Sequence, residues 1–304
     1  MKKNLVIAVV GATAIGKTKL AIELAKHFKT EIISADSRQF FKEMTIGTAV
    51  PSNEELIEAK HHFIQHISIK DAYSVGDFEK EATAKLNQLF KSHNTVILVG
   101  GSGMYVDAVV KGLDDFPEAP NSIREELNQQ MKTNGLKSLQ ELLKKKDPVY
   151  YEKVDLDNPH RVIRALEVCI ASGKPFSSFL NQLKPQRNFK TLYVGINAER
   201  EIIYRRINLR VDKMMQEGLL SEAKHLHQFK NLNALNTIGY KELFSYLEGK
   251  ISLDEAVAEI KKNTRRFAKR QLTWYRKNEN IIWVDFDDSL ESKIAKIKNA
   301  LENE

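Results

Sequence analysis

The stretch Gly11-Ala12-Thr13-Ala14-Ile15-Gly16-Lys17-Thr18 decides the fold, because it fits the pattern G-x-x-x-x-G-K-[ST]. The β-branched run at residues 4–10 predicts a buried strand before it, and the apolar spacing of residues 17–29 predicts a helix after it. In that context the loop N–H groups and the helix N-terminus face one oxyanion. Lys17 adds a positive charge, and Thr18 is placed to reach a bound Mg²⁺. The stretch therefore predicts a di- or triphosphate site without specifying ATP.

Strand signals recur between helical patterns along much of the chain. Short apolar runs predict four further strands, at residues 31–35, 95–99, 191–196 and 281–285. Strands that alternate with helices form parallel sheets that are covered on both faces. We therefore predict an α/β fold with a P-loop NTPase-like parallel sheet, built from residues 1–113 and 189–304.

The pattern changes in the middle of the chain. Pro117 and Pro120 interrupt it, and no strand signal follows until residue 191. Apolar spacing instead predicts three helices, at residues 122–131, 136–145 and 159–171. We predict that residues 114–188 form an all-helical domain inserted into the α/β core.

Composition limits the class of protein. The chain has 304 residues, 42% of them hydrophobic, and a formal net charge of +7 that suits a phosphate-bearing partner without proving one. A single cysteine, Cys169, excludes an internal disulfide and a cysteine-based zinc site, so a reducing cytoplasm is the expected compartment. No run reaches the roughly 20 apolar residues of a membrane helix. We expect a monomer that does not bind membranes.

Two polar residues follow strand ends. Asp36 comes directly after the strand expected at residues 31–35, and ligands of open α/β sheets bind at the carboxyl ends of strands. Three roles stay open for Asp36: a general base, a carboxylate associated with Mg²⁺, and a loop or helix cap. Ser102 follows the strand at residues 95–99 and could present its hydroxyl to a substrate or cap the next helix. A Walker-B strand would end in Asp or Glu, whereas this one ends in glycine, so the chain does not fit an ordinary ATPase.

A basic helix is predicted near the C-terminus. The capping box Ser252-Leu253-Asp254-Glu255 begins it, and one stripe of the helix is apolar. Its other faces carry eight basic residues and no acidic ones over residues 261–277, namely Lys261, Lys262, Arg265, Arg266, Lys269, Arg270, Arg276 and Lys277. A solvated helix face usually mixes both signs. We therefore favour an RNA phosphate track over a solvated face, with Trp274 and Tyr275 as stacking surfaces.

Three histidines, His61, His62 and His66, have the composition of a metal cluster. Only His62 and His66, four residues apart, could share a helix face, and the sequence offers no third ligand. We interpret all three as structural residues.

Nine segments in a fixed order give the chain a specific resemblance. They are GATAIGKT, SADSRQFFKEMTIGTAVP, HHFIQHI, YSVGDF, ILVGGSGMYVDAVVKGL, NPHRVIRALEV, RINLRVDKMMQEGLL, NTIGYKEL and NTRRFAKRQLTWYRK. Over nearly its whole length the chain resembles the bacterial tRNA dimethylallyltransferases, also called tRNA isopentenyltransferases. The resemblance implies transfer of a dimethylallyl group from dimethylallyl pyrophosphate to N6 of adenosine-37, next to the tRNA anticodon.

The resemblance also implies roles for individual residues. The phosphate loop and Arg210 would hold the pyrophosphate leaving group with Mg²⁺, and Asp36 would be the general base on the adenine amine. Ser102 would lie near the amine and the phosphate. Expected contacts with the tRNA anticodon stem-loop, those of the basic helix included, are Asp36, Ser37, Arg38, Gln39, Ser102, Arg124, His160, Arg161, Val162, Ile163, Arg164, Arg265, Arg266, Lys269 and Arg270.

Some positions depart from the common family pattern. Ala12 replaces proline, Ile15 replaces a small serine, Val50 replaces lysine, Ser102 replaces threonine and His160 replaces glutamine. Ser102 keeps the hydroxyl, so the expected chemistry is retained, while Ile15 and Val50 affect detail on the substrate side.

Two other functions share parts of the pattern. A small-molecule kinase would have the same phosphate loop and α/β core, but it predicts ATP turnover and a lid with arginines. The basic helix and the glycine end of the strand at residues 95–99 count against it. A non-catalytic RNA-binding module would bind tRNA without any need for Asp36.

Overall fold

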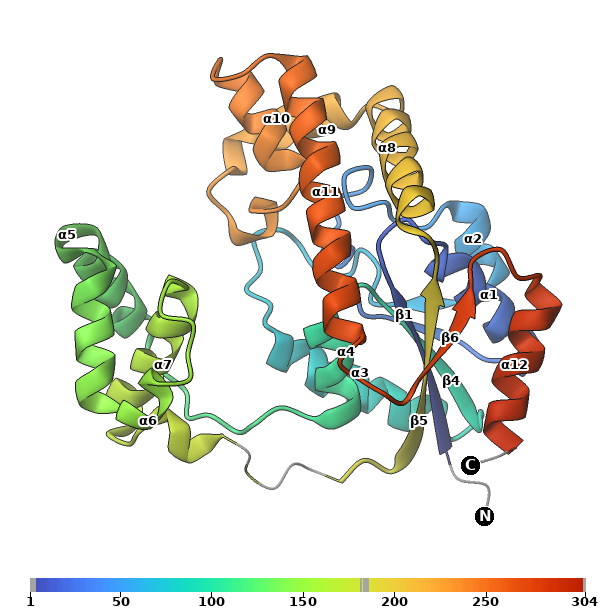
Figure 1. Cartoon of the computed structure of the whole chain (residues 1–304), viewed down its shortest axis with the longest axis horizontal. Helices are drawn as coiled ribbons and strands as arrows, with labels where there is room; N and C mark the ends of the chain where they lie inside the picture. The colour runs from blue at the N-terminus through green and yellow to red at the C-terminus, as the bar shows by residue number, and fades with distance from the viewer. Residues whose placement is uncertain (1–3, 181, 183–185, 303–304) are drawn as a thin grey trace. The chain divides into compact units, whose positions relative to one another are not determined.

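A single parallel sheet forms the centre of the computed structural model, which describes residues 4–180, 182 and 186–302 (Figure 1). Within these residues six strands lie in the order β3-β2-β4-β1-β5-β6. Their bounds are β1 (Asn4–Gly11), β2 (Ile32–Ser34), β3 (His61–His62), β4 (Thr95–Val99), β5 (Phe189–Asn197) and β6 (Ile281–Asp285). The predicted parallel α/β sheet is confirmed, and β3 is the strand that the sequence did not predict, because two residues leave no pattern.

The central strand β1 pairs with β4 on one side and β5 on the other. From β1 the chain passes over β4 to reach β2, whereas after β4 it eventually returns to the opposite side of β1. Connections that diverge in this way leave a crevice at the carboxyl ends of the two strands, where α/β proteins bind ligands. The loop after β1 and the turn after β4 both lie at this edge.

Helices cover both faces of the sheet. They are α1 (Lys17–Phe28) and α12 (Leu290–Glu302) on one face, and α3 (Val75–Leu89) and α4 (Gly103–Lys111) on the other. Along β1, Ile7 and Val9 belong to the first core, and Val6 and Ala8 belong to the second. Alternate residues of a strand point to opposite faces, and burying one large aliphatic side chain contributes about 1.5–3 kcal/mol.

A further helical layer stands over the carboxyl ends of the strands (Figure 1). Its elements are α2 (Asn53–Glu58), α8 (Arg200–Gln216), α9 (Leu219–Leu226), η2 (His227–Phe229), η3 (Asn233–Leu235), α10 (Tyr240–Leu247) and the start of α11 (Leu253–Tyr275). Most of these elements share a third core with Met44 and Tyr240. We call α8, α9, α10 and the start of α11 the helical cap; the sequence did not predict it.

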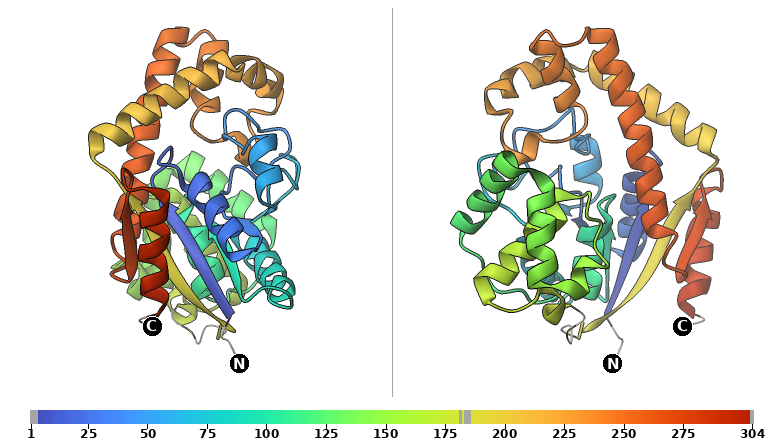
Figure 2. Two further views of the ribbon diagram at one scale, coloured as in Figure 1. Left: turned by 90° about the vertical axis from the view of Figure 1, so that its right-hand side faces the viewer. Right: turned by 60° about the vertical axis from the view of Figure 1, so that its left-hand side comes forward.

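The helix α11 joins the helical cap to the sheet, as Figures 1 and 2 show. It contributes Ile260 to the core of the cap, Ala268 to one face of the sheet and Tyr275 to the other. The predicted capping box begins it, since the Ser252 hydroxyl accepts the Glu255 N–H at 3.2 Å and Glu255 accepts the Ser252 N–H at 2.7 Å. The predicted basic helix is therefore a structural element of the α/β core.

A second compact unit comprises Gly112–Gln186. Its helices are α5 (Asn121–Lys146), α6 (Pro148–Tyr151), α7 (Pro159–Ser172) and η1 (Phe176–Phe179). Gly135 interrupts α5 with φ 75° and ψ 171°, which divides it into two segments. Leu127, Leu139 and Leu166 belong to a core of its own. Across the described ranges of the whole chain, no helix is both long and apolar enough to cross a membrane.

Gly100 provides a test of the contact between the ends of β2 and β4. A Cβ at Gly100 would lie 2.5 Å from the Ala35 carbonyl oxygen, which belongs to rigid backbone. We expect Gly100→Ala to lower the free energy of unfolding by about 1–3 kcal/mol, as overpacking does. Urea denaturation measures it. Gly76→Ala is the control, because a Cβ there meets only the Ser74 hydroxyl at 3.5 Å, and equal midpoints for the two variants would contradict the prediction.

Candidate functional site

The phosphate loop has the curled conformation that its glycines predict. Gly11 has φ +136° and Gly16 has φ +101°, which glycine adopts without strain. A Cβ at Gly11 would also lie 3.2 Å from the Ile196 carbonyl oxygen of β5. Gly16 is the N-cap of α1 and has no side chain to satisfy the first N–H groups of that helix. These groups and the positive end of the helix dipole form an anion site.

Three cations surround the loop. The Lys17 ammonium donates to the Ala12 carbonyl at 2.7 Å, and Arg210 of α8 donates to the Thr13 hydroxyl at 3.3 Å. Arg206, which sequence analysis did not identify, donates to the Ala14 carbonyl at 2.7 Å. The pKa of Lys17 is lowered by burial to about 8, although the negative charge of Asp36 opposes the shift. Burial also lowers the pKa of Arg210. A bound anion would stabilise both charges.

Asp36 and Ser102 come together at the ends of β2 and β4. The Ser37 N–H donates to the Ser102 hydroxyl at 3.3 Å, and the Ser37 and Ser102 hydroxyls are 3.1 Å apart. Asp36 Oδ1 accepts the Arg38 N–H at 3.1 Å, a local turn that partly matches the loop-cap role. Asp36 and Ser102 both line the cavity described next, so the carboxylate also faces ligand space.

A cavity of about 750 Å³ lies between the carboxyl edge of the sheet and the helical cap. Thr13, Asp36, Ser102 and Arg210 line its polar wall. Its apolar wall comes from the helical cap, α11 and the loop before α10, and includes Met214, Ile238, Leu219, Ile260 and Phe267. The predicted phosphate, carboxylate and hydroxyl groups therefore open onto one space.

Glu222 is a supporting residue that sequence analysis missed. Its carboxylate accepts the N–H groups of Thr45, Ile46 and Gly47 at 2.8–3.0 Å, and the Tyr240 hydroxyl at 2.6 Å. Gly47 lines the cavity, so this carboxylate fixes part of its wall. No sequence pattern links positions this far apart.

Two residues expected to contact tRNA hold the protein's own loops. The Gln39 amide is buried and donates to the Thr48 and Ala49 carbonyls at 3.2 and 2.8 Å. Arg38 donates to the Asn233 and Ala234 carbonyls at 3.1 and 3.0 Å, although it also lines the cavity.

In the second unit, the predicted tRNA contacts divide into two groups. His160, Arg161 and Arg164 are exposed on α7. Val162 and Ile163 are instead 0% and 4% exposed within the core of this unit, so the expectation that their side chains contact tRNA is corrected. They face inward because the apolar stripe of α7 packs on that side.

A buried carboxylate organises the arginines of this unit. Glu167, only 3% exposed, accepts both Nε and Nη2 of Arg124, the latter at 2.8 Å, and pairs with Arg164 at 3.5 Å. The two guanidinium groups nevertheless keep 57% and 44% of their side-chain surface exposed. They remain available to a phosphate.

On α11 the basic residues differ in exposure. Arg266, Lys269 and Arg270 are exposed, whereas Arg265 is half-buried and donates to Asn208 at 2.8 Å. Two nearer the helix start, Lys261 and Lys262, pair with Asp212 at 2.6 Å and Glu259 at 2.7 Å.

The two aromatic residues at the end of α11 also differ. Trp274 is 43% exposed and lines the cavity, and its indole N–H is fixed by Asp107 at 3.1 Å. Tyr275 is 2% exposed, so its predicted stacking role is wrong: the ring packs against the sheet.

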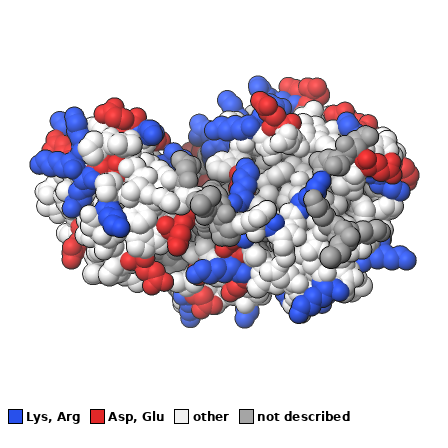
Figure 3. All heavy atoms as spheres, turned by 90° about the horizontal axis from the view of Figure 1, so that it is seen from below, with Lys and Arg blue, Asp and Glu red and all other residues white. Residues whose placement is uncertain are grey.

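Charge is mixed on one face of the molecule. On the face shown in Figure 3, Asp and Glu side chains are interspersed with Lys and Arg. This is the pattern of an ordinary solvated surface. The run of basic residues on α11 is a different arrangement.

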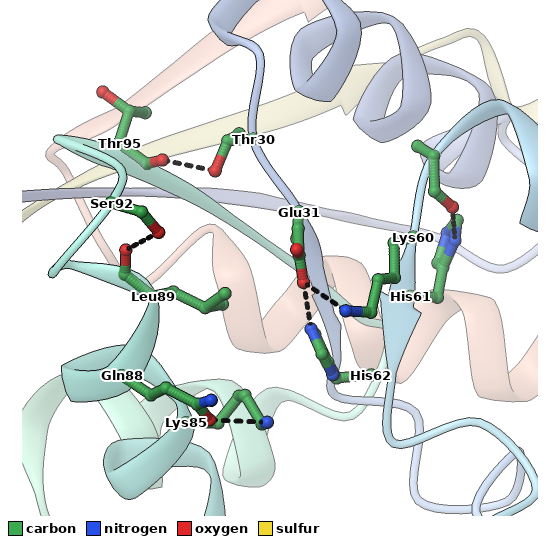
Figure 4. A network of polar contacts seen from close by, with 11 residues as sticks. Thr30, Glu31, Lys60, His61, His62, Lys85, Gln88, Leu89, Ser92 and Thr95 are labelled. Atoms are coloured by element: carbon green, nitrogen blue, oxygen red, sulfur yellow. Dashed lines mark hydrogen bonds and ion pairs between the residues drawn. The ribbon is translucent and has the colours of Figure 1, made fainter.

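The three histidines make contacts within the protein, and none of them lies on a helix. His61 and His62 form β3, where His62 bonds Glu31 at 2.6 Å and His61 bonds the Ala59 carbonyl at 2.8 Å (Figure 4). His66 packs edge-on against Phe40 at a ring distance of 5.4 Å. No group of three or more metal-ligating side chains occurs in the described part of the chain.

Comparisons with known proteins agree with this site. A family model described as IPP transferase matches residues 39–278. The tRNA dimethylallyltransferase of Christiangramia forsetii is 60% identical over 96% of this chain and 99% of its own length. That of Flavobacterium johnsoniae is 59% identical over 92% and 93%.

Solved structures extend the comparison. A tRNA isopentenylpyrophosphate transferase from Bacillus halodurans matches with a TM-score of 0.73 and 37% identity, over 99% of this chain and 96% of that one. A eukaryotic dimethylallyltransferase captured acting on tRNA matches with a TM-score of 0.83 and 26% identity, over 99% and 79%. Because the family model covers most of the chain and these relatives cover nearly all of it, the chain belongs to the IPP transferase family.

Proposed function

We propose that this protein transfers a dimethylallyl group from dimethylallyl pyrophosphate to N6 of adenosine-37 in tRNA and releases pyrophosphate. The observation that carries the proposal is a single cavity onto which the phosphate loop, the Asp36–Ser102 pair and α11 all open. The loop suits the leaving group, the carboxylate suits the amine proton, and the basic face of α11 suits RNA. The strand β4 ends at Val99 and is followed by Gly100 and Gly101 rather than by a Walker-B acid, which favours a pyrophosphate over ATP.

The cavity suits dimethylallyl pyrophosphate in size and polarity. Ligand pockets usually enclose about 300–1,000 Å³, and this one has about 750 Å³. The apolar wall, including Met214 and Phe267, suits an isoprenoid, while the polar wall, including Thr13 and Arg210, suits its pyrophosphate.

The reaction follows from these positions. The C1–O bond of the allylic pyrophosphate breaks, and the negative charge that develops on the leaving oxygens is stabilised by loop N–H groups, Lys17 and Arg210. The adenine N6 forms the new bond to C1, and Asp36 accepts its proton. The target base must leave the RNA stack first, at a cost of a few kcal/mol. In this proposal the basic residues of α11 and the exposed Trp274 hold the RNA around the displaced base.

The donor set fits Mg²⁺ bound mainly through its substrate. Mg²⁺ usually keeps several waters and binds one or two protein oxygens together with phosphate oxygens. Thr18, in the first turn of α1, and Asp36, on the cavity wall, provide such oxygens. When bound there, the ion would supply further positive charge for the leaving pyrophosphate. The monomeric state and the cytoplasmic location stay predictions from sequence.

One experiment tests the function directly. The protein is incubated with Mg²⁺, dimethylallyl pyrophosphate and a tRNA that carries adenosine-37, and the nucleosides are analysed by mass spectrometry. We expect N6-dimethylallyl adenosine, and none with a matched tRNA that carries guanosine-37. Steady ATP hydrolysis without prenylated nucleoside would favour a kinase instead.

Replacing Asp36 tests the general base. Asp36→Asn keeps size and hydrogen bonding but cannot accept the proton, so we expect single-turnover transfer to fall about 10²–10⁴-fold with little change in substrate affinity. Asp287→Asn, an exposed carboxylate after β6, is the control. Rescue of Asp36→Asn by excess Mg²⁺ would indicate a metal ligand, and normal transfer with a lower melting temperature would indicate a cap.

The lowered pKa of Lys17 predicts that affinity for dimethylallyl pyrophosphate depends on pH. Its pKa is about 8 in the free protein, so raising the pH through 8 removes the charge that attracts pyrophosphate. The terminal phosphate of the ester titrates lower, near pH 6. Affinity for dimethylallyl pyrophosphate should therefore fall between pH 7.5 and 9.5, by up to about tenfold per pH unit. Lys17→Arg keeps its charge and should flatten the titration by calorimetry; the same slope in both proteins would refute the assignment.

The basic face of α11 predicts a salt dependence. Each phosphate contact contributes about 0.7–0.9 to the slope of log affinity against log salt. Arg266→Glu together with Lys269→Glu should lower the slope for tRNA by about 1–2, measured by filter binding. The control is the double variant Lys91→Glu with Lys298→Glu. It changes the net charge by the same amount, at exposed residues that do not line the cavity. Equal slopes for the two double variants would indicate that the basic face of α11 is only a solvated surface and does not contact tRNA phosphates.

A further inference from the structure

A buried amide on α11 joins the two halves of the site. Gln271 is 6% exposed, its Oε1 accepts the Thr13 N–H at 2.7 Å, and its Nε2 donates to the Gly101 carbonyl at 2.9 Å. The side chain therefore bridges the phosphate loop and the turn after β4. From the sequence alone, Gln271 lies on the apolar stripe of the helix and would be interpreted as a residue that packs in the core.

The bridge needs a side chain with an acceptor and a donor side by side. At neutral pH a primary amide offers both, whereas an exposed carboxylate is ionised and only accepts, and asparagine is one methylene shorter than glutamine. Gly101 leaves the necessary room, since a Cβ there would lie 2.3 Å from the Gln271 Nε2. The Thr13 N–H is occupied by Gln271, so this contact positions the loop rather than binding the anion.

The contacts continue from both ends of the bridge to the reacting groups. Thr13 accepts a hydrogen bond from Arg210, a proposed pyrophosphate ligand. Gly101 directly precedes Ser102, which bonds Ser37 next to Asp36. Gln271 thus directly connects the side of the cavity where the C1–O bond would break with the side where the N6–C1 bond would form.

We propose that Gln271 is a positioning residue that sets the separation between the pyrophosphate site and the Asp36–Ser102 pair. This inference rests on the proposed function. In a displacement, a misplacement of about 1 Å can cost about 10²-fold in rate. Loss of the bridge should therefore slow the chemical step more than it weakens either substrate.

A matched control lies one turn further along α11. Tyr275 is 2% exposed, and its hydroxyl donates to the Gly100 carbonyl at 3.3 Å. Tyr275→Phe removes a buried hydrogen bond between the same helix and the same turn without touching the phosphate loop. Gln271→Met removes both bonds of the bridge at nearly constant volume.

The first measurement compares single-turnover transfer, substrate affinities and melting temperature. We expect Gln271→Met to transfer about 10–100-fold more slowly, with affinities for dimethylallyl pyrophosphate and tRNA within about threefold of the unchanged protein. Tyr275→Phe should lose stability with a nearly normal rate. Equal rates for Gln271→Met and Tyr275→Phe, or a loss in affinity alone, would overturn the proposal.

A second measurement uses pH. In Gln271→Glu the carboxylate still accepts the Thr13 N–H, but it donates to the Gly101 carbonyl only when protonated. The rate of Gln271→Glu relative to the unchanged protein should therefore rise as pH falls, while that of Gln271→Met stays flat. Lys17, Arg210 and Asp36 lie close together in this region and are present in every variant, so the ratio of rates removes their contribution.

Transfer by the unchanged protein tests the proposed function independently of the role of Gln271. If it fails to transfer in the same assay, that function is overturned and this inference with it. If it transfers but the ratio for Gln271→Glu is flat with pH, only the role of Gln271 is overturned.

Discussion

The rest of the structure depends on one constraint: several cationic side chains are partly buried around the phosphate loop. Lys17, Arg206 and Arg210 donate to loop carbonyls and a hydroxyl, and the acidic residue that attracts both Lys17 and Arg210 is Asp36. Such a group of cations is stable only in a rigid frame, since each charge loses solvation. β1, β5, α8 and α11 together provide that frame.

The helix α11 both packs in the hydrophobic cores and carries exposed basic side chains, two roles that usually belong to different elements. One stripe contributes side chains to three hydrophobic cores, so its position is fixed at both ends. The exposed side carries Arg266, Lys269 and Arg270. A partner that binds this side therefore contacts a helix whose opposite side holds the phosphate loop through Gln271. Substrate recognition and the reaction site share one rigid element.

The sequence predicted those parts whose signal is local. The loop after β1 and the capping box of α11 follow from residues a few positions apart, and the α/β sheet follows from strands of three or more residues. β3 escaped because it has two residues. The inward position of Val162 follows from the helical stripe of α7, but a motif shared with a family does not distinguish a contact residue from its buried neighbour.

The residues that hold the site in place could not be predicted from the sequence, for a different reason. The contact of Gln271 with Thr13 joins residues 258 positions apart, and that of Glu222 with Ile46 joins residues 176 apart. Neither pair has a periodicity or a motif, because the contacts exist only after the helical cap has packed. The groups that we propose for the chemistry could be predicted from the sequence, whereas the groups that hold them could not.

The contact between Gly47 and Tyr240 has a consequence for how this chain can change over evolutionary time. A Cβ at position 47 would lie 2.6 Å from the Tyr240 ring, and the Tyr240 hydroxyl bonds the carboxylate that holds the backbone of Thr45, Ile46 and Gly47. A side chain at 47 requires a smaller ring at 240, which leaves the carboxylate of Glu222 without one partner. Positions 47, 222 and 240 are therefore expected to vary together, because a substitution at one of them disturbs a contact that the other two make.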